Sequence, residues 1–168
     1  MNYIRVFYRK TENREDVYKL LGDAACKVYS ISMPKILKDK NGKPFFEGRE
    51  DINFSLSHSG DYVMCALSDE PVGADIQEIK QLSPQMIKRV FTEGELNNAD
   101  PINLWCLKES FIKLQGLLDR QYSKIEFIRD GDNYTGPENY KGKVIDCIDG
   151  YIMAVCSYKN KNVIVSTL

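Results

Sequence analysis

The sequence of 168 residues lacks a long apolar run, and no stretch approaches the roughly 18 apolar residues that a membrane-spanning helix needs. It also lacks a charge excess, because 23 basic residues stand against 24 acidic ones, so a polyanion such as DNA would find no overall attraction. The opening MNYIRVFYRK alternates like a strand and contains no signal-peptide core. We therefore expect a cytoplasmic protein that binds neither nucleic acid nor membrane.

Residues that bind zinc or form disulfides are few and poorly spaced. There is one histidine, and the five cysteines form no CxxC pair. An odd number of cysteines leaves one without a partner in any disulfide framework. The composition therefore supports neither a zinc cluster nor a disulfide scaffold, and it fits a reducing compartment.

The apolar content of 43% is enough for one folded domain, or for two small lobes that share a core. Alternation predicts an opening strand in NYIRVFYR, and 3.6-residue spacing predicts a helix in REDVYKLLGDAACKVYSI. After a lysine-rich loop, strands are predicted in INFSLS, YVMCALS and VGADIQEI. Helices follow in SPQMIKRVF, with Ser83 as its cap, and in NLWCLKESFIKLQG, which ends at Gly116. The last third contains the strand candidates KIEFI, KVIDCI, YIMAVCSY and NVIVSTL, with a hairpin turn at Asp149-Gly150.

Two segments of the sequence resemble each other. SGDYVMCALS (59–68) and DGYIMAVCS (149–157) each contain a glycine turn, a tyrosine, an aliphatic residue and a methionine. The similarity predicts an α+β, pseudo-duplicated architecture, in which each lobe is a helix on a small, mostly antiparallel sheet. The lobes would span about 1–72 and 73–168, with a cleft between them. Alternatively, buried strands resemble each other because they draw on few residue types. No low-complexity linker separates the halves, so we expect a single fused domain, 1–168.

Two oxygen-bearing side chains share one face of the strand predicted at VGADIQEI. The strand period of two puts Asp75 and Gln77 on the same side. If Glu109 of the later helix approaches this face, the site offers two carboxylates and an amide oxygen, which suit Mg²⁺. Cysteine and histidine are absent from this set, which argues against zinc. The alternative is that Asp75 and Gln77 are ordinary solvent-facing strand residues.

The helix predicted at 103–116 combines charged and apolar residues on one stripe. Trp105, Glu109, Ile112 and Lys113 are spaced three or four apart, so they lie one above the other. The only tryptophan and an isoleucine should face inward, which would place Glu109 and Lys113 at a cleft wall. Lys113 could there neutralise charge on a phosphoryl group. Taken alone, a Glu–Lys pair on a helix means little.

The only histidine, His58, lies where a strand gives way to a Ser-Gly-Asp turn. Ser57 and Ser59 could donate hydroxyl hydrogen bonds to phosphate oxygens, and the imidazole could donate as well. A Ser–His hydrolase is a competing interpretation, but the chain has no GxSxG elbow and adjacent strand residues point to opposite sides. A third interpretation is a turn histidine with one local hydrogen bond. The lysine-rich loop upstream, which ends in Lys43 and Pro44, could also reach a phosphate bound at this place.

Taken together, these segments resemble the 4′-phosphopantetheinyl transferases of the surfactin-synthetase-activating (Sfp-like) type. The matching motifs, in order, are NGKP (41–44), FSLSHSG (54–60), VGADIQ (72–77), FTEGE (91–95), WCLKESFIKLQG (105–116) and YIMAVCS (151–157). The resemblance implies Mg²⁺-dependent transfer of the phosphopantetheine arm of coenzyme A to a serine of an apo acyl or peptidyl carrier protein. Adenosine 3′,5′-bisphosphate would be released. It also implies a monomeric pseudodimer with coenzyme A in the cleft.

The resemblance also implies roles for individual residues. The metal positions would be Asp75, Glu109 and the more variable Gln77, and Glu109 and Lys113 would act in catalysis. Asp75 would also border the coenzyme A site. The remaining coenzyme A contacts would be Lys113 at the pyrophosphate, Lys108 at a second phosphate position, Ser57 and His58 at the nucleotide phosphates, and Lys43 with Pro44 beside the adenine.

The sequence departs from the family pattern in three places. Gln77 stands where an acid is common, which predicts weaker Mg²⁺ binding. The N-terminal region lacks the family's early basic cluster and offers only Lys19 for the 3′-phosphate. After Gly116 the chain continues LLDRQYSKIEF and has no second glycine. The missing acid favours a rival reading, a non-catalytic module that binds coenzyme A or a carrier protein.

Overall fold

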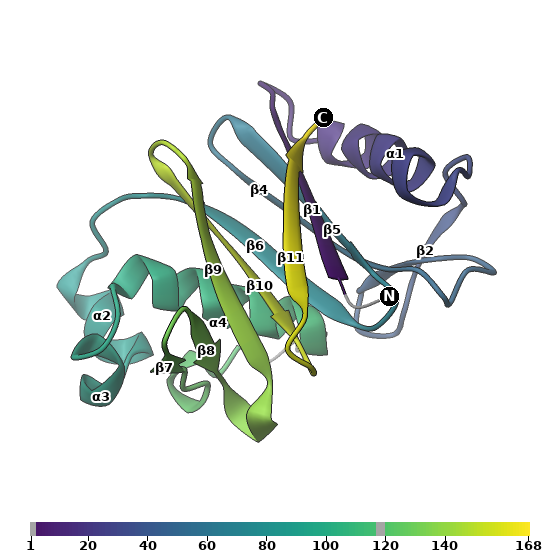
Figure 1. Ribbon diagram of the computed structural model, residues 1–168. Helices are drawn as coiled ribbons and strands as arrows, with labels where there is room; N and C mark the ends of the chain where they lie inside the picture. The colour runs from purple at the N-terminus through teal and green to yellow at the C-terminus, as the bar shows by residue number, and fades with distance from the viewer. Residues whose placement is uncertain (1–2, 117–119) are drawn as a thin grey trace.

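The computed structural model describes residues 3–116 and 120–168, and it has the α+β, two-lobed architecture expected from the sequence (Figure 1). The helices are α1 (Asp16–Tyr29), α2 (Pro84–Val90), α3 (Glu93–Leu96) and α4 (Pro101–Gln115), with 3-10 turns at Tyr122–Lys124 and Pro137–Asn139. The strands are β1 (Tyr3–Lys10), β2 (Ile36–Lys38), β3 (Pro44–Phe46), β4 (Asn53–Ser59), β5 (Tyr62–Ser68), β6 (Val72–Glu78), β7 (Ile128–Asp130), β8 (Asn133–Thr135), β9 (Lys141–Ile148), β10 (Tyr151–Ser157) and β11 (Asn162–Thr167).

The helix ends follow the signals in the sequence. Ser83 caps α2, and its hydroxyl accepts a hydrogen bond from the Met86 backbone N–H. Helix α4 begins at Pro101 after an Asp100 cap, and it ends at Gly116, whose φ of 64° is the left-handed conformation of a helix C-cap. The two helices expected around residues 83–116 are therefore confirmed.

The pseudo-duplication is visible in the order of the strands. In the first sheet, β5 lies between β1 and β4, and in the second sheet β10 lies between β6 and β9. The central strands β5 and β10 are the two segments that resemble each other in sequence. In each sheet the first strand of the lobe (β1 or β6) pairs with the second strand of a hairpin (β5 or β10), which in turn pairs with the first strand of that hairpin (β4 or β9). The two similar segments therefore occupy equivalent places in a repeated unit, and their similarity is more than a coincidence of residue types.

The two repeated segments meet in the middle of the molecule. Met64 and Met153 belong to one buried cluster that both sheets share. The rings of Tyr62 and Tyr151 stack edge to face with centroids 4.8 Å apart. Equivalent residues of the two lobes therefore pack on each other, which explains why the lobes are fused into one domain.

Two strands show how the segments expected as lobes, about 1–72 and 73–168, are arranged in the structure. Val72 begins β6 and so belongs to the second lobe. The last strand, β11, does not stay in the second lobe but returns to pair with β1 in parallel at the edge of the first sheet (Figure 1). This parallel pairing uses the backbone groups along the edge of β1, which would otherwise be an unpaired edge of the first sheet.

Two other segments also differ from the expectation. The lysine-rich segment expected as a loop contains the short hairpin β2–β3. The segment KIEFI (124–128) was expected to be a strand, but β7 begins only at its last residue, Ile128. The residues before it are irregular, and two of them, Ile125 and Phe127, are buried in the core. Periodicity alone does not separate a short apolar run that anchors a loop from a strand.

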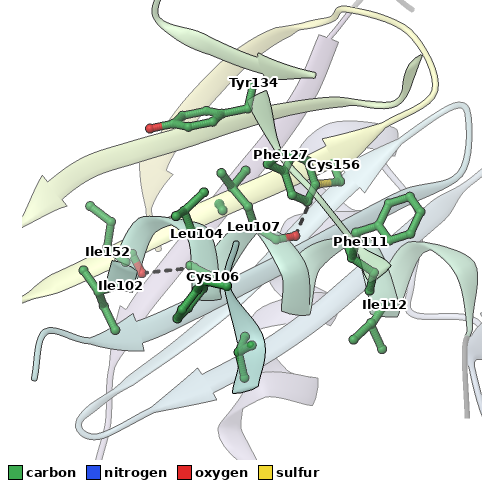
Figure 2. Close-up of a cluster of buried hydrophobic side chains, with 14 of the residues drawn as sticks. Ile102, Leu104, Cys106, Leu107, Phe111, Ile112, Phe127, Tyr134, Ile152 and Cys156 are labelled. Atoms are coloured by element: carbon green, nitrogen blue, oxygen red, sulfur yellow. Dashed lines mark hydrogen bonds between the residues drawn. The ribbon is translucent and has the colours of Figure 1, made fainter. Parts of the chain in front are cut away.

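Each lobe buries its helix against its sheet. Figure 2 shows the larger of these contacts, in which α4 packs on β10 and on the segment after α4 that contains Phe127. The Cys106 thiol donates to the Ile152 carbonyl and the Cys156 thiol donates to the Leu107 carbonyl, both at 3.6 Å. Helix α4 also presses on β6 so closely that a Cβ on Gly73 would lie 1.9 Å from the Ser110 carbonyl oxygen. This contact requires glycine and fixes α4 over the strand that carries Asp75.

The two sheets are joined by side chains of serine. Strands β4 and β6 are edges of different sheets and share no backbone ladder. Three serines of β4 instead accept hydrogen bonds from backbone N–H groups of β6. These bonds run from Ala74 to Ser55 at 2.9 Å, from Ile76 to Ser57 at 3.3 Å and from Glu78 to Ser59 at 2.9 Å. Strand alternation puts all three hydroxyls on one side, and we call this contact the serine seam.

Among residues 3–116 and 120–168, no helix combines the length and the apolar composition needed to cross a membrane.

The serine seam predicts unequal effects of serine removal. Ser55→Ala leaves the buried Ala74 N–H without a partner, which should lower the free energy of unfolding by about 1 to 3 kcal/mol. Ser59→Ala is the matched control, because its bond to Glu78 is exposed and water can replace the hydroxyl. Urea denaturation followed by tryptophan fluorescence measures both. Equal losses in the two variants would contradict the seam as described.

Candidate active site

Asp75 is a buried carboxylate at the meeting point of three elements. Its side chain accepts from Lys113 Nζ of α4 at 2.6 Å and from the Ser57 hydroxyl of β4 at 2.7 Å, both at Oδ1. The amide nitrogen of Gln77, on the same face of β6, donates to Oδ2 at 2.6 Å. Asp75 is only 2% exposed, and a buried charge is tolerated only when it is paired and hydrogen-bonded. Three donors supply that compensation here.

Ser57 is committed to this cluster. A hydroxyl has one proton and two acceptor sites. The proton goes to Asp75, while the oxygen accepts from the Ile76 N–H and from Lys113 Nζ, the latter at 2.7 Å. Every hydrogen-bonding capacity of Ser57 is therefore in use. In this arrangement the hydroxyl cannot donate to a phosphate, contrary to the role expected from the sequence, and it aligns Asp75 and Lys113 instead.

Glu109 faces the same cluster from α4. One turn before it, the Cys106 thiol contacts the Asp75 backbone carbonyl at 3.3 Å. One turn after it, Lys113 contacts the Asp75 carboxylate. Because residues three and four apart share a helix face, Glu109 lies on α4 between the two residues that make these contacts. Asp75 and Glu109 therefore belong to two packed elements, β6 and α4, and Gln77 lies beside Asp75.

Sequence reasoning missed two residues beside Glu109. The Tyr122 hydroxyl donates to Glu109 Oε1, and Arg120 Nη1 lies 3.9 Å from the same oxygen. Burial and the bond to Glu109 together raise the pKa of Tyr122 to about 12. Both residues belong to the segment LLDRQYSKIEF, of which residues 117–119 lie outside the described residues. The departure from the family pattern was the only signal of this segment's importance.

Lys108 does not face the cleft. Its ammonium is fully buried and donates to Glu95 Oε2 at 2.8 Å, to the Val90 carbonyl at 2.9 Å and to the Tyr122 carbonyl at 3.2 Å. Burial lowers its pKa, and the Glu95 carboxylate opposes that shift. Three partners and no exposure leave no access for a phosphate. The expectation of a phosphate contact is therefore replaced by a structural role, which ties α4 to α3 and to the segment around Tyr122.

A cavity of about 240 Å³ opens beside Lys113 between the lobes. Its walls come from the 41–44 loop and β4 on one side, and from the end of α4 with Arg120 on the other. Lys43 and Pro44 both line it. Lys43 Nζ, however, donates to the Leu114 carbonyl at 2.8 Å, so it also holds the loop against the C-terminal end of α4. Burial lowers the pKa of Lys43.

A second cavity of about 330 Å³ continues from the first and shares Gly42, Pro44 and Leu56 with it. The exposed His58 lines it together with Lys38 and Arg14. Lys19, suggested by the sequence, does not; its ammonium pairs with Asp16 at 2.7 Å on the surface. Ser57 lines this cavity too, together with the acidic Glu15, although its hydroxyl is bonded to Asp75 and to the serine seam.

A wider hollow of about 890 Å³ lies between α2, α3 and the start of α4, and contains none of the expected site residues. Within the described residues, no three histidine, cysteine or carboxylate side chains are grouped to bind a metal.

Comparison with known proteins places this arrangement in a family. The family model of the 4′-phosphopantetheinyl transferase superfamily matches residues 71–156, which include both carboxylates and Lys113. The chain is 30% identical to the 4′-phosphopantetheinyl transferase Sfp of Bacillus subtilis (strain 168), over 89% of this chain and 78% of that protein. The chain therefore belongs to the 4′-phosphopantetheinyl transferase superfamily, and it is an enzyme of that class.

Shorter matches point the same way. The transferase psf-1 of Bacillus pumilus is 38% identical over 53% of this chain, and the transferase gsp of Aneurinibacillus migulanus is 34% identical over 62%. These two alignments cover 43% and 51% of the relatives. The chain thus matches about half the length of these two relatives and more of Sfp.

The burial of Lys108 predicts a large stability effect. Lys108→Met leaves Glu95 buried without its cation, which should lower the free energy of unfolding by about 3 to 5 kcal/mol. The exposed Lys88→Met should change it by less than about 0.5 kcal/mol. Chemical denaturation measures both. A stable Lys108→Met protein that has lost activity would instead restore Lys108 as a phosphate contact.

Proposed function

We propose that the enzyme transfers the 4′-phosphopantetheine group of coenzyme A to a serine of an apo acyl or peptidyl carrier protein, and releases adenosine 3′,5′-bisphosphate. The observation that carries the proposal is the ion pair between the buried Asp75 and Lys113, because Lys113 also lines the cavity between the lobes. Glu109 lies on the same face of α4, between the two residues that contact Asp75. This is an electrostatic arrangement for a pyrophosphate and a metal ion. The family membership and the names of the relatives support the same reaction.

The donor chemistry fits Mg²⁺. Asp75, Glu109 and the amide oxygen of Gln77 are hard oxygen ligands without a competing thiolate or imidazole. The amide nitrogen of Gln77 already donates to Asp75, which turns the amide toward the carboxylate. We propose these three residues as the ones that would hold the ion. When bound, the ion would neutralise charge on the pyrophosphate oxygens.

Coenzyme A would lie along the two connected cavities. Lys113 and Arg120 line the inner one and would contact the pyrophosphate. Lys43 and Pro44 would border the adenine where the cavities join. His58, with the Lys38 and Arg14 side chains beside it, would face the phosphate on the ribose. The inner cavity is lined by three cations, and the outer one by Arg14 and Lys38 with His58 and one acid, Glu15. Cations along both cavities would suit a ligand with phosphates at two places.

The chain's own residues can carry the proton and charge movements. The serine hydroxyl oxygen of the carrier attacks the phosphorus that bears the pantetheine arm, and the new O–P bond forms as the bond to the bridging oxygen breaks. Glu109 would take the serine proton, directly or through water, and Lys113 would stabilise the charge that develops on the phosphoryl oxygens. The leaving nucleotide keeps the bridging oxygen. Its negative charge is met by the same basic lining that held it before transfer.

Both walls of the proposed site come from one chain, because β4 and the 41–44 loop face α4. A monomer is therefore sufficient for the reaction, and we propose that the enzyme acts as one. The five cysteines are all free thiols, three of them buried, which supports a reducing compartment such as the cytoplasm.

The alternative is a module that binds coenzyme A or a carrier protein without catalysis, as Gln77 suggested. Binding needs the basic cavity but no buried carboxylate beside it. Glu109 is only 8% exposed, on the face of α4 that contacts the buried Asp75, so two carboxylates are desolvated in this region. That arrangement favours the transferase.

The proposed role of Glu109 as the base can be tested by measuring the transfer reaction. Intact-mass analysis of a panel of apo carrier proteins, incubated with coenzyme A and Mg²⁺, should show the mass gain of one phosphopantetheine. Glu109→Gln should slow this gain by about 100-fold or more, because the amide cannot accept the serine proton. Glu138→Gln, an exposed carboxylate away from the cleft, should match the wild type. If the wild type modifies none of the carriers, the binding module becomes the better account.

The proposed place of Gln77 in the metal site can be tested by replacing its amide with a carboxylate. Gln77→Glu removes the donor to Asp75 and sets two carboxylates side by side, so without divalent metal the variant should unfold about 1 kcal/mol more easily. Adding Mg²⁺ should restore its stability and half-saturate its activity at a lower concentration than in the wild type. Thermal unfolding with EDTA and with Mg²⁺ measures this. A metal response identical to the wild type would remove Gln77 from the proposed metal site.

A further inference from the structure

Tyr122 is held at both ends by consecutive residues of α4. Its backbone carbonyl accepts from the buried Lys108 ammonium at 3.2 Å, and its hydroxyl donates to Glu109 Oε1. Consecutive helix residues point about 100° apart, so Tyr122 bridges the buried face of α4 and the cleft face. The buried Lys108–Glu95 pair thereby fixes the backbone of a residue whose side chain reaches the proposed base.

The ring of Tyr122 is fixed as well. It packs on Trp105, one turn before Glu109, with ring centroids 4.7 Å apart and an interplanar angle of 39°. The tryptophan and the glutamate share a face of α4 because they are four residues apart. A ring that lies on Trp105 therefore directs its hydroxyl toward Glu109. Backbone and ring contacts together determine where the hydroxyl stands before any ligand arrives.

A glutamate on a helix has several rotatable bonds, and fixing them costs conformational entropy. The hydrogen bond from Tyr122 engages Oε1, so it sets the rotation of the carboxylate about its last bond. A phenol does this without adding positive charge, unlike the guanidinium of Arg120, which stays 3.9 Å away. The carboxylate keeps its negative charge for a cation or a proton while its orientation is restrained.

We infer that Tyr122 is a positioning residue for the reaction: its hydroxyl holds one oxygen of Glu109 so that the other is presented to the metal and to the carrier serine. This inference rests on the proposed function. Lys108 and Trp105 contribute by holding Tyr122, and neither touches the substrate. Tyr122 belongs to the segment after Gly116 that departs from the family pattern.

Two variants separate the contribution of the Tyr122 hydroxyl from that of its ring, and a third serves as a control. Tyr122→Phe keeps the ring on Trp105 and removes only the hydroxyl. Tyr122→Leu removes both. Tyr134→Phe is the matched control, because this tyrosine is buried in the hydrophobic cluster against which Tyr122 packs (Figure 2) and belongs to β8, a strand that carries no residue of the proposed site. Thermal unfolding of each variant reports the contribution of the ring to stability, since Tyr122→Leu should be the least stable of the three.

The test combines steady-state transfer kinetics with Mn²⁺ binding measured by electron paramagnetic resonance, without coenzyme A. Tyr122→Phe should lower kcat by about 10- to 100-fold and weaken Mn²⁺ binding by about tenfold, because a group that orients a metal ligand has effects of this size. Its KM for coenzyme A should stay within about twofold of the wild type, since the cavity lining is untouched. Tyr134→Phe should match the wild type throughout.

Two results would overturn the inference. One is a Tyr122→Phe enzyme with wild-type kcat and Mn²⁺ affinity. The other is a lower kcat with unchanged Mn²⁺ affinity, because the hydroxyl would then not act through Glu109. Failure of the proposed function looks different: the wild type itself would modify no carrier protein, while the comparison of Mn²⁺ binding would still decide whether Tyr122 orients Glu109.

Discussion

The contact among Asp75, Lys113 and Ser57 is the interaction on which the arrangement of the site depends. Asp75 is buried, so its charge must be compensated by nearby donors. The donors come from β4 of the first lobe and from α4 of the second, at 2.7 and 2.6 Å. Because the same three groups join β4, β6 and α4, the compensation of one charge also fixes the relative position of the lobes. The cleft opens directly beside this contact.

The duplicated lobes have diverged at the places that chemistry needs. The buried face of α1 consists of aliphatic residues and alanines, whereas α4 buries Lys108, Glu109 and Ser110 at the equivalent layer. The seam between the lobes has diverged as well. A backbone ladder would have used alternate N–H groups of β6, but serine hydroxyls accept from these groups instead, and the hydroxyl of Ser57 also lies beside Asp75. The repeat supplies a cleft, and substitutions in the second lobe supply its charge.

Much of this could be predicted from residue patterns. Alternation predicted the face of β6 shared by Asp75 and Gln77, and helical spacing predicted that Glu109 and Lys113 share a face of α4, because both depend on local periodicity. The role of Lys108 could not be predicted, since a lysine beside Glu109 looks the same in sequence whether it meets a phosphate or the distant Glu95. The return of β11 to β1 and the reach of Tyr122 across α4 are also long-range contacts, which periodicity does not report.

Crystals grown with coenzyme A and MnCl₂ would test most directly whether Asp75 and Glu109 act as a pair. Anomalous scattering locates Mn²⁺ without assuming its ligands. The arrangement of the cleft predicts one strong peak between the Asp75 and Glu109 carboxylates, within coordination distance of the pyrophosphate. A peak elsewhere on the protein, or coenzyme A bound in the cleft with no metal between these carboxylates, would contradict it.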